Sequence, residues 1–146
     1  CGSGDKTSLN KFSPGASLRV WRDFLKKKKI FGADKNKRLL FNEKRIETYY
    51  VDQTKRNSIK EMWKIVNYKN FDLIIDDGLH NFNANIIFFS DSFKYLKKGG
   101  VYFIEDVLLN KLNKYELYFN KKGIDYEIIY FENINYSNHC IIKIIK

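Results

Sequence analysis

Hydrophobic residues recur along the chain in two patterns that alternate with one another. Short apolar runs rich in β-branched and aromatic residues are typical of strands, whereas apolar residues three or four positions apart indicate helices with one buried face. The runs predict strands at residues 30–34, 46–53, 71–75, 101–104, 126–134 and 139–145. The helical spacing predicts helices at residues 15–25, 58–66, 82–96 and 108–122.

The order of these elements indicates an α/β fold. Residues 73–75 form an apolar run without a polar face, as expected for a strand that is buried on both sides in a parallel sheet. Helices between such strands cover both faces, so we expect a doubly wound, mostly parallel sheet. The last two strands, joined by turn residues 135–138, predict a C-terminal antiparallel hairpin. With 146 residues and 44% hydrophobic content, residues 1–146 are expected to form a single domain.

Two of the predicted strands end in charged residues. Asp76, Asp77 and His80 follow the strand at 71–75, and Glu105 and Asp106 follow the strand at 101–104. Ligands of open α/β sheets bind at the carboxyl ends of strands, so the position of these residues indicates a binding or catalytic site. The alternative is that Asp76 or Asp77 caps the following helix. If the two strands are parallel neighbours, Asp77, Glu105 and Asp106 reach one rim, where three carboxylates suit Mg²⁺, with His80 beside them.

These residues also carry a resemblance to a known family. IIDDGLH at 74–80, the helix after it and LKKGGVYFIEDV at 96–107 resemble the class I S-adenosylmethionine-dependent methyltransferases. The resemblance is specifically to metal-dependent sugar O-methyltransferases of the macrocin and mycinamicin type, and it extends over residues 14–106 and includes GASLRVW at 15–21. It implies a Rossmann-like fold, S-adenosylmethionine as methyl donor and Mg²⁺ as cofactor. The acceptor that it implies is a hydroxyl on a sugar of a surface polysaccharide or secondary metabolite.

The resemblance further implies roles for individual residues. His80 would take the proton of the acceptor hydroxyl, beside a metal held by Asp77, Glu105 and Asp106. The expected contacts with S-adenosylmethionine come from Gly2, Gly4, Ser17, Asp34, Asp52, Gln53 and Asp76.

Some of these cofactor residues have a second interpretation. Asp34 ends a strand where an acid can accept hydrogen bonds from ribose hydroxyls, but it could equally be a turn residue. Asn36 stands where many relatives carry a second acid, a departure that would weaken the ribose contact. Ser17 and Ser58 stand near predicted helix starts, and for both of them we favour helix capping.

The first residues, Cys-Gly-Ser-Gly, have no initiator Met before them. By resemblance, Gly2 and Gly4 form the glycine-rich turn that passes close to the cofactor, which would place the first strand before Cys1 and make the chain a fragment. The alternative is a flexible tail or a cloning remnant. Two other functions therefore stay open: a truncated or non-catalytic domain, and a nucleotide-sugar-binding enzyme of the same fold.

Charge and cysteine content narrow the choice of partners. A formal net charge of +10 would suit a polyanionic partner such as nucleic acid. Apart from the run at 26–29, however, the lysines are scattered along the chain. We therefore interpret them as solvated surface and do not expect nucleic-acid binding. Two cysteines are too few for a disulfide framework and fit a cytoplasmic protein. No apolar run has the length of a membrane span. The expected partner is a saccharide or other small-molecule acceptor, with a homo-oligomer left open.

Overall fold

The computed structural model describes residues 14–131 and 138–146, and the chain divides into two compact units. Unit 1 ends at Val51 and unit 2 comprises Asp52–Lys146. Gly2 and Gly4, the two glycines predicted to approach the cofactor, lie outside the described residues. The single domain predicted for residues 1–146 stays a prediction. No helix in the described part of the chain is long and apolar enough to cross a membrane.

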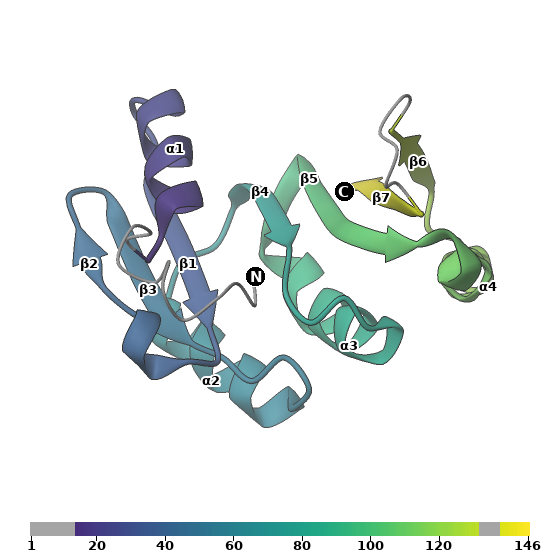
Figure 1. The fold of residues 1–146 in the computed structure, drawn as a ribbon, viewed down its shortest axis with the longest axis horizontal. Coiled ribbons are helices and arrows are strands. Elements are labelled where there is room, and N and C mark those ends of the chain that lie inside the picture. Colours follow the sequence, from purple (N-terminus) through teal and green to yellow (C-terminus); the bar gives the residue numbers. More distant parts are fainter. Residues whose placement is uncertain (1–13, 132–137) are drawn as a thin grey trace, which may run out of the picture. The chain divides into compact units, whose positions relative to one another are not determined.

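Unit 1 is a small α/β unit (Figure 1). It contains α1 (Ala16–Phe24), β1 (Ile30–Asp34), the 3₁₀ turn η1 (Lys37–Leu39), β2 (Asn42–Glu43) and β3 (Ile46–Tyr50). β1 and β3 pair in parallel with Ile30 opposite Ile46, and β2 adds an antiparallel edge to β3. A Cβ atom on Gly32 would lie 2.5 Å from Leu18 Cδ1, so α1 can approach β1 this closely only because that residue is glycine.

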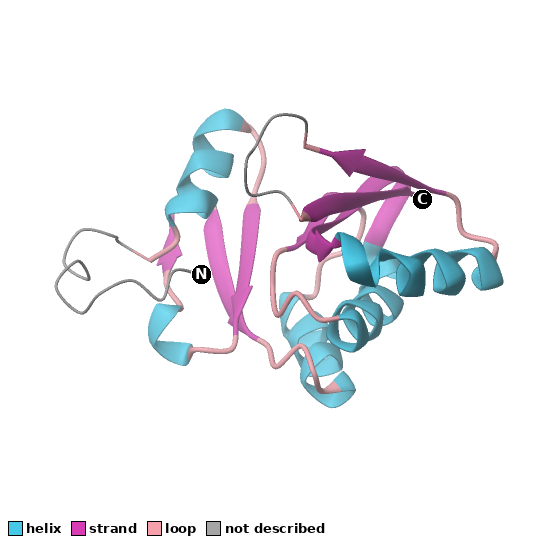
Figure 2. Ribbon diagram, turned by 45° about the vertical axis from the view of Figure 1, so that its right-hand side comes forward, coloured by secondary structure: helices cyan, strands magenta, loops and turns pink. Residues whose placement is uncertain are grey.

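Unit 2 contains the larger sheet (Figures 1 and 2). Its elements are α2 (Arg56–Val66), β4 (Phe71–Asp76), α3 (Phe82–Ser92), η2 (Phe93–Tyr95), β5 (Leu96–Leu108), η3 (Leu109–Lys111), α4 (Leu112–Lys122), β6 (Tyr126–Tyr130) and β7 (His139–Ile145). The strand order is β4-β5-β7-β6. β4 and β5 are parallel, whereas β7 is antiparallel to both of its neighbours. The predicted parallel pair and the C-terminal hairpin are thus confirmed.

An aromatic core holds the helices of unit 2 against this sheet. Phe89 of α3 contacts Tyr102 of β5 edge-on at 5.1 Å between ring centroids, and Phe119 of α4 at 5.3 Å. Trp63 of α2 stacks on Tyr95 at 4.3 Å. These rings are largely or wholly removed from water, and buried aromatic pairs stabilise a fold beyond the area that they bury. The strands β4 and β5, whose ends carry the predicted site residues, therefore belong to a well-packed core.

Both serine caps predicted from the sequence are wrong. α1 starts after Gly15, whose left-handed backbone (φ 81°) begins the helix without a side-chain cap, and Ser17 lies inside the helix. The N-cap of α2 is Lys55, again without a side-chain cap. The hydroxyl of Ser58 instead accepts a hydrogen bond from the backbone N–H of Asp52 at 2.8 Å.

Several element boundaries also differ from the prediction. The strand predicted at 46–53 ends at Tyr50, so Asp52 and Gln53 lie in the turn before α2. The helix predicted at 82–96 ends as α3 at Ser92, and the chain has already entered β5 at Leu96. The helix predicted at 108–122 begins only at Leu112, after a 3₁₀ turn.

Candidate functional site

The loop after β4 and the end of β5 bring three of the predicted site residues together. Asp77, His80 and Asp106 each offer one ligand atom, and these atoms all lie within 4.8 Å of one another. His80 Nε2 lies 3.7 Å from Asp77 Oδ1 and 3.9 Å from Asp106 Oδ2. The two carboxylate side chains are 60% and 58% exposed, so a ligand can reach them from solvent. Two carboxylates and an imidazole at this spacing can bind a divalent cation.

The backbone around this cluster is unusual for strand ends. His80 and Asp106 both have positive φ, at 51° and 53°. The pairing of β5 with β7 also shifts register between Ile104 and Val107, so Glu105 and Asp106 leave the regular ladder. Such irregularities re-aim side chains and are frequent next to functional sites. This one turns Asp106 toward the loop that carries His80.

Glu105 lies outside the three-residue cluster but is influenced by it. Burial raises the pKa of Glu105, the negative charges of Asp77 and Asp106 raise it further, and His80 lowers it. Mutual repulsion between neighbouring carboxylates is relieved when a cation binds between them. The structure therefore brings Asp77 and Asp106 of the predicted trio together, and it places His80 beside them, as the sequence indicated.

Asp76 is buried in the interior, unlike its neighbour Asp77. Its side chain accepts hydrogen bonds from Gln53 Nε2 at 2.5 Å and from Asn85 Nδ2 at 3.0 Å, and the residue is 3% exposed. Burial raises the pKa of Asp76, while these two hydrogen bonds lower it. The N-cap of α3 is Asn81, so the idea that Asp76 or Asp77 caps this helix is wrong.

Asp52 and Gln53 both have partners within unit 2. Asp52 is buried, and its Oδ1 accepts hydrogen bonds from the Thr54 backbone N–H at 3.1 Å and from the Thr54 hydroxyl at 2.7 Å. Gln53 joins the Asp76 carboxylate to the backbone N–H of Leu79. These contacts shape the turn and the loop, and the cofactor roles of the two residues stay predictions.

The sequence reasoning did not identify the buried partners of Asp76. Asn85 lies in α3 and is 1% exposed. Its Oδ1 accepts a hydrogen bond from the hydroxyl group of Tyr115 in α4 at 2.7 Å. The available signal was a polar residue at helical spacing with the buried apolar residues of α3, because buried polar groups require partners.

In unit 1, Asp34 ends β1 as predicted. Its Oδ1 accepts a hydrogen bond from the backbone N–H of Asn36 at 2.6 Å, and the side chain of Asn36 in turn accepts the N–H of Arg38 at 3.1 Å. Asp34 is partly exposed, which is compatible both with a turn and with a ribose contact. Ser17 is exposed on the first turn of α1.

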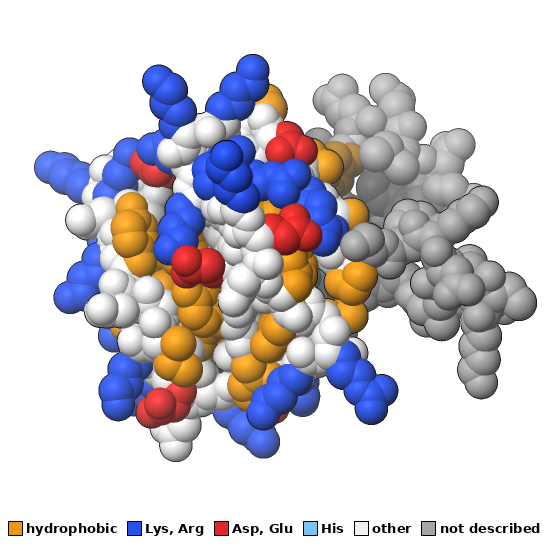
Figure 3. All heavy atoms as spheres, turned by 90° about the vertical axis from the view of Figure 1, so that its left-hand side faces the viewer, with side chains coloured by type: hydrophobic (Ala, Val, Ile, Leu, Met, Phe, Trp, Pro, Cys, Tyr) orange, Lys and Arg blue, Asp and Glu red, His pale blue; other side chains and the backbone are white. Residues whose placement is uncertain are grey.

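Most of the net positive charge belongs to unit 1. Its described residues, 14–51, contain eleven lysines and arginines against four acids, a net +7 out of +10 for the whole chain. Figure 3 shows Lys and Arg side chains with acids between them on one face. Several of these cations are paired, including Arg19 with Glu43 and Lys29 with Glu47. The pairing supports the interpretation of this charge as solvated surface.

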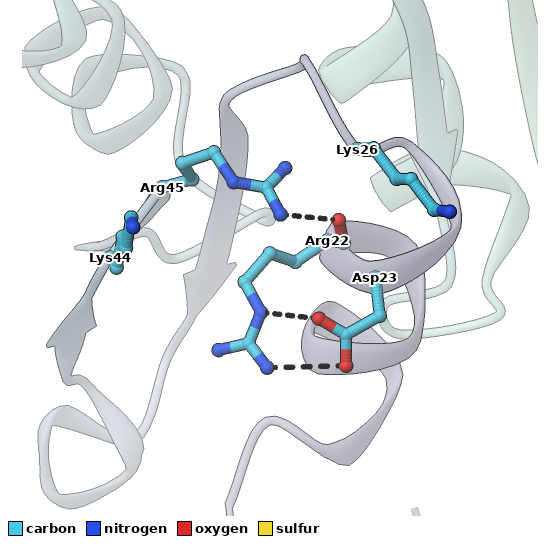
Figure 4. Close-up of a pocket in the computed structure, with 5 residues that line it drawn as sticks. All are labelled: Arg22, Asp23, Lys26, Lys44 and Arg45. Atoms are coloured by element: carbon cyan, nitrogen blue, oxygen red, sulfur yellow. Dashed lines mark hydrogen bonds and ion pairs between the residues drawn. The ribbon is translucent and has the colours of Figure 1, made fainter.

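A pocket of about 480 Å³ in unit 1 is lined by Arg22, Asp23, Lys26, Lys44 and Arg45 (Figure 4). The guanidinium of Arg45 donates to the backbone carbonyl groups of Arg22 and Leu25, both at 2.9 Å, near the end of α1. Arg22 is paired with Asp23. Both arginines thus have structural partners, since the last carbonyl groups of a helix lack intrahelical donors.

The chain is similar in sequence to several O-methyltransferases, although no family model matches it. It is 35% identical over 94 residues to mycinamicin VI 2''-O-methyltransferase of Micromonospora griseorubida. It is 34% identical over 93 residues to demethylmacrocin O-methyltransferase of Streptomyces fradiae. Both alignments cover 64% of this chain but only 23% of the relative, so the chain spans about a quarter of the length of these relatives.

Solved structures of other proteins have a similar fold. MycE methyltransferase in complex with Mg, SAH and mycinamycin VI matches with a TM-score of 0.63 and 23% identity, over 97% of this chain and 42% of that chain. The fibrillarin pre-rRNA processing protein of Methanococcus jannaschii matches with a TM-score of 0.61 and 18% identity, over 84% and 58%. The predicted Rossmann-like fold and the predicted resemblance to sugar O-methyltransferases are both confirmed.

Proposed function

We propose that this protein transfers a methyl group from S-adenosylmethionine to a sugar hydroxyl with the assistance of Mg²⁺. The observation that carries the proposal is the convergence of Asp77, His80 and Asp106 at the adjacent ends of two parallel strands. The similarity to enzymes named as sugar O-methyltransferases supports the reaction type. A neighbouring structure that contains Mg and SAH supports the metal and the methyl donor.

The donor atoms of the cluster fit a hard divalent cation. Asp77 and Asp106 present exposed carboxylates in the cluster. Glu105 lies outside the cluster but next to it, and its pKa is raised by burial and by the charges of Asp77 and Asp106. Carboxylate oxygen and water are the ligands that Mg²⁺ prefers. Asp77, Glu105 and Asp106 would therefore hold the metal, as the sequence predicts.

The chemical problem is that an alcohol is a weak nucleophile near neutral pH. When bound, Mg²⁺ supplies positive charge that acidifies a hydroxyl, and S-adenosylmethionine supplies an electrophilic methyl group. His80 accepts the hydroxyl proton at Nε2, the ring atom that faces Asp77 and Asp106. Imidazole suits this task because its neutral ring nitrogen can accept a proton.

Asp34 is the proposed acceptor for the ribose hydroxyl groups of the methyl donor. It ends β1 with a partly exposed carboxylate, and a carboxylate can accept two hydrogen bonds from a diol. The proposed methyl acceptor is a sugar of a surface polysaccharide or secondary metabolite, which is supported by a relative named as a 2'-O-methyltransferase of an α-L-rhamnosyl tetracenomycin. We place the reaction in the cytoplasm, where a free buried thiol such as Cys140 is common.

The proposal is tested by methyl transfer to a panel of hexosides and 6-deoxyhexosides, with products detected by mass spectrometry. We expect a methylated product with Mg²⁺ and none with EDTA, and we expect Asp77→Asn to abolish it. Asp125→Asn, which changes an exposed acid in the loop between α4 and β6, is the matched control. Equal rates in Mg²⁺ and EDTA would contradict the metal role. Binding of S-adenosylmethionine without methyl transfer to any member of the panel would contradict the substrate class.

A further inference from the structure

We propose that Gln53 is a positioning residue that fixes the loop of residues 77–80, so that Asp77 and His80 face Asp106. The inference rests on the proposed function, because it concerns the geometry of the proposed metal site. Gln53 acts through two hydrogen bonds, one to the buried carboxylate of Asp76 and one to the backbone of Leu79.

Both the nitrogen and the oxygen of the Gln53 side-chain amide form hydrogen bonds. Its Nε2 donates to Asp76 Oδ1 at 2.5 Å, and its Oε1 accepts the backbone N–H of Leu79 at 2.9 Å. These partners lie on either side of Asp77 in the sequence, one residue before it and two after it. A single side chain therefore joins the end of β4 to the loop and fixes the backbone that carries Asp77.

Gly78 allows this close contact. A Cβ atom at this position would lie 2.2 Å from Gln53 Oε1 and 3.2 Å from Asp76 Oδ1. Atoms cannot approach to 2.2 Å without moving, so any side chain at residue 78 would displace the Gln53 amide. The glycine in the DDGLH stretch thus has a packing reason that the sequence pattern alone did not give.

Asp76 is a firm anchor for Gln53 because it is fixed from the other side as well. Its Oδ2 accepts a hydrogen bond from Asn85 of α3, and Asn85 accepts one from Tyr115 of α4. Asp76, Asn85 and Tyr115 are only 3%, 1% and 2% exposed. A buried polar network whose members are paired rigidifies its surroundings. Because Gln53 is hydrogen-bonded to both Asp76 and Leu79, this network also holds the loop of residues 77–80.

The loop needs such support because the conformation of His80 is costly. Its φ of 51° lies in the left-handed region, and its buried Nδ1 has no hydrogen-bond partner among the described residues. Both features cost free energy, so they persist only where neighbouring groups impose them. The hydrogen bond from Leu79 to Gln53, one residue before His80, is suited to impose this conformation.

The test compares Mn²⁺ binding by electron paramagnetic resonance in the wild type and in Gln53→Met, which keeps the side-chain length but removes both hydrogen bonds. Mn²⁺ serves as the spectroscopic probe for the Mg²⁺ site. We expect the variant to bind Mn²⁺ at least about tenfold more weakly, as is usual when a group supporting metal ligands is lost. Asn57→Met, an exposed position in α2, is the control and should bind like the wild type.

A second variant keeps the test decisive if Gln53→Met does not fold. Gly78→Ala retains Gln53 but pushes its amide off the loop, and we expect a similar loss of affinity with a normal circular dichroism spectrum. Unchanged Mn²⁺ affinity in either folded variant would overturn the positioning role while leaving the proposed function intact. A wild type that binds no Mn²⁺ would overturn both, which distinguishes the two failures.

Discussion

Asp76 and Asp77 are adjacent in the sequence, but the structure gives them different tasks. Asp76 is 3% exposed and hydrogen-bonded to side chains of two other segments, whereas the side chain of Asp77 is 60% exposed and faces His80. Successive side chains along an extended chain point in opposite directions, so two acids at a strand end separate in this way. The buried acid organises the site, and the exposed acid is available to a ligand.

Replacing His80 tests its role as a base. In His80→Ala we expect methyl transfer to fall by about 10²–10⁴-fold, the usual contribution of a general base. Mn²⁺ affinity should be unchanged, because Asp77, Glu105 and Asp106 remain. Single-turnover methyl transfer and Mn²⁺ titration measure the two effects separately. Loss of Mn²⁺ binding in this variant would show instead that His80 is a metal ligand.

The ion pairs of Glu43 predict a pH dependence of stability. Hydrogen bonding from Arg19 lowers the pKa of Glu43 below its ordinary value of 4.5, and the charge of Arg22 lowers it further. A carboxyl group with a lowered folded-state pKa contributes stability above the unfolded-state value, and this contribution is lost as the pH falls through the folded-state value.

The wild type should therefore melt at a higher temperature than Glu43→Gln at neutral pH. The difference should shrink as the pH falls below 4.5 and through the lowered pKa of Glu43, and it should be smaller in high salt, since these groups are exposed to solvent. Thermal unfolding followed by circular dichroism at several pH values measures this difference. A difference that stays constant with pH would mean that the charge of Glu43 makes no contribution.

The elements that could be predicted best are those whose apolar runs are bounded by turn residues. The predicted strands at 30–34 and 139–145 agree with the observed β1 and β7. The stretch at 82–96 was harder, because apolar residues continue at helical spacing after α3 has ended at Ser92. Sequence periodicity does not mark the point at which the chain leaves a helix for a strand.

The site could be predicted in part for a similar reason. Asp77, His80 and Asp106 follow apolar strands, so their meeting required only that β4 and β5 be parallel neighbours. The support for the loop depends on contacts between distant segments. Gln53 lies 23 positions from Asp76, and Tyr115 lies 30 positions from Asn85, and no local pattern links such pairs.

Packing of α4 on the sheet of unit 2 gives a prediction about stability. Phe119 is 0% exposed and contacts Phe89, Tyr118 and Tyr126. Phe119→Ala should lower the free energy of unfolding by about 3–5 kcal/mol, because it removes buried apolar surface and leaves a cavity. Leu117→Ala on the same helix, where the side chain is 70% exposed, is the control. Equal effects in urea unfolding would contradict the observed packing of α4.

At the scale of the whole molecule, the net charge and the proposed metal site belong to different units. Unit 1 carries a net +7 in its described residues, whereas the acidic cluster of Asp77, His80 and Asp106 belongs to unit 2. Several of the cations of unit 1 are paired with acids, so we interpret this charge as solvated surface. Unit 2 carries the proposed metal and base, and unit 1 carries Asp34, the proposed ribose acceptor.

The central claim is that the protein is a methyltransferase that uses S-adenosylmethionine, and calorimetric titration with this donor tests it most directly. The titration is made with and without Mg²⁺ on the wild type, Asp34→Ala and Asp77→Ala. We predict binding that Asp34→Ala abolishes, together with an effect of Mg²⁺ on the complex that Asp77→Ala removes. The absence of any binding to a folded wild-type protein would contradict the claim and leave a Rossmann-like domain without a methyl donor.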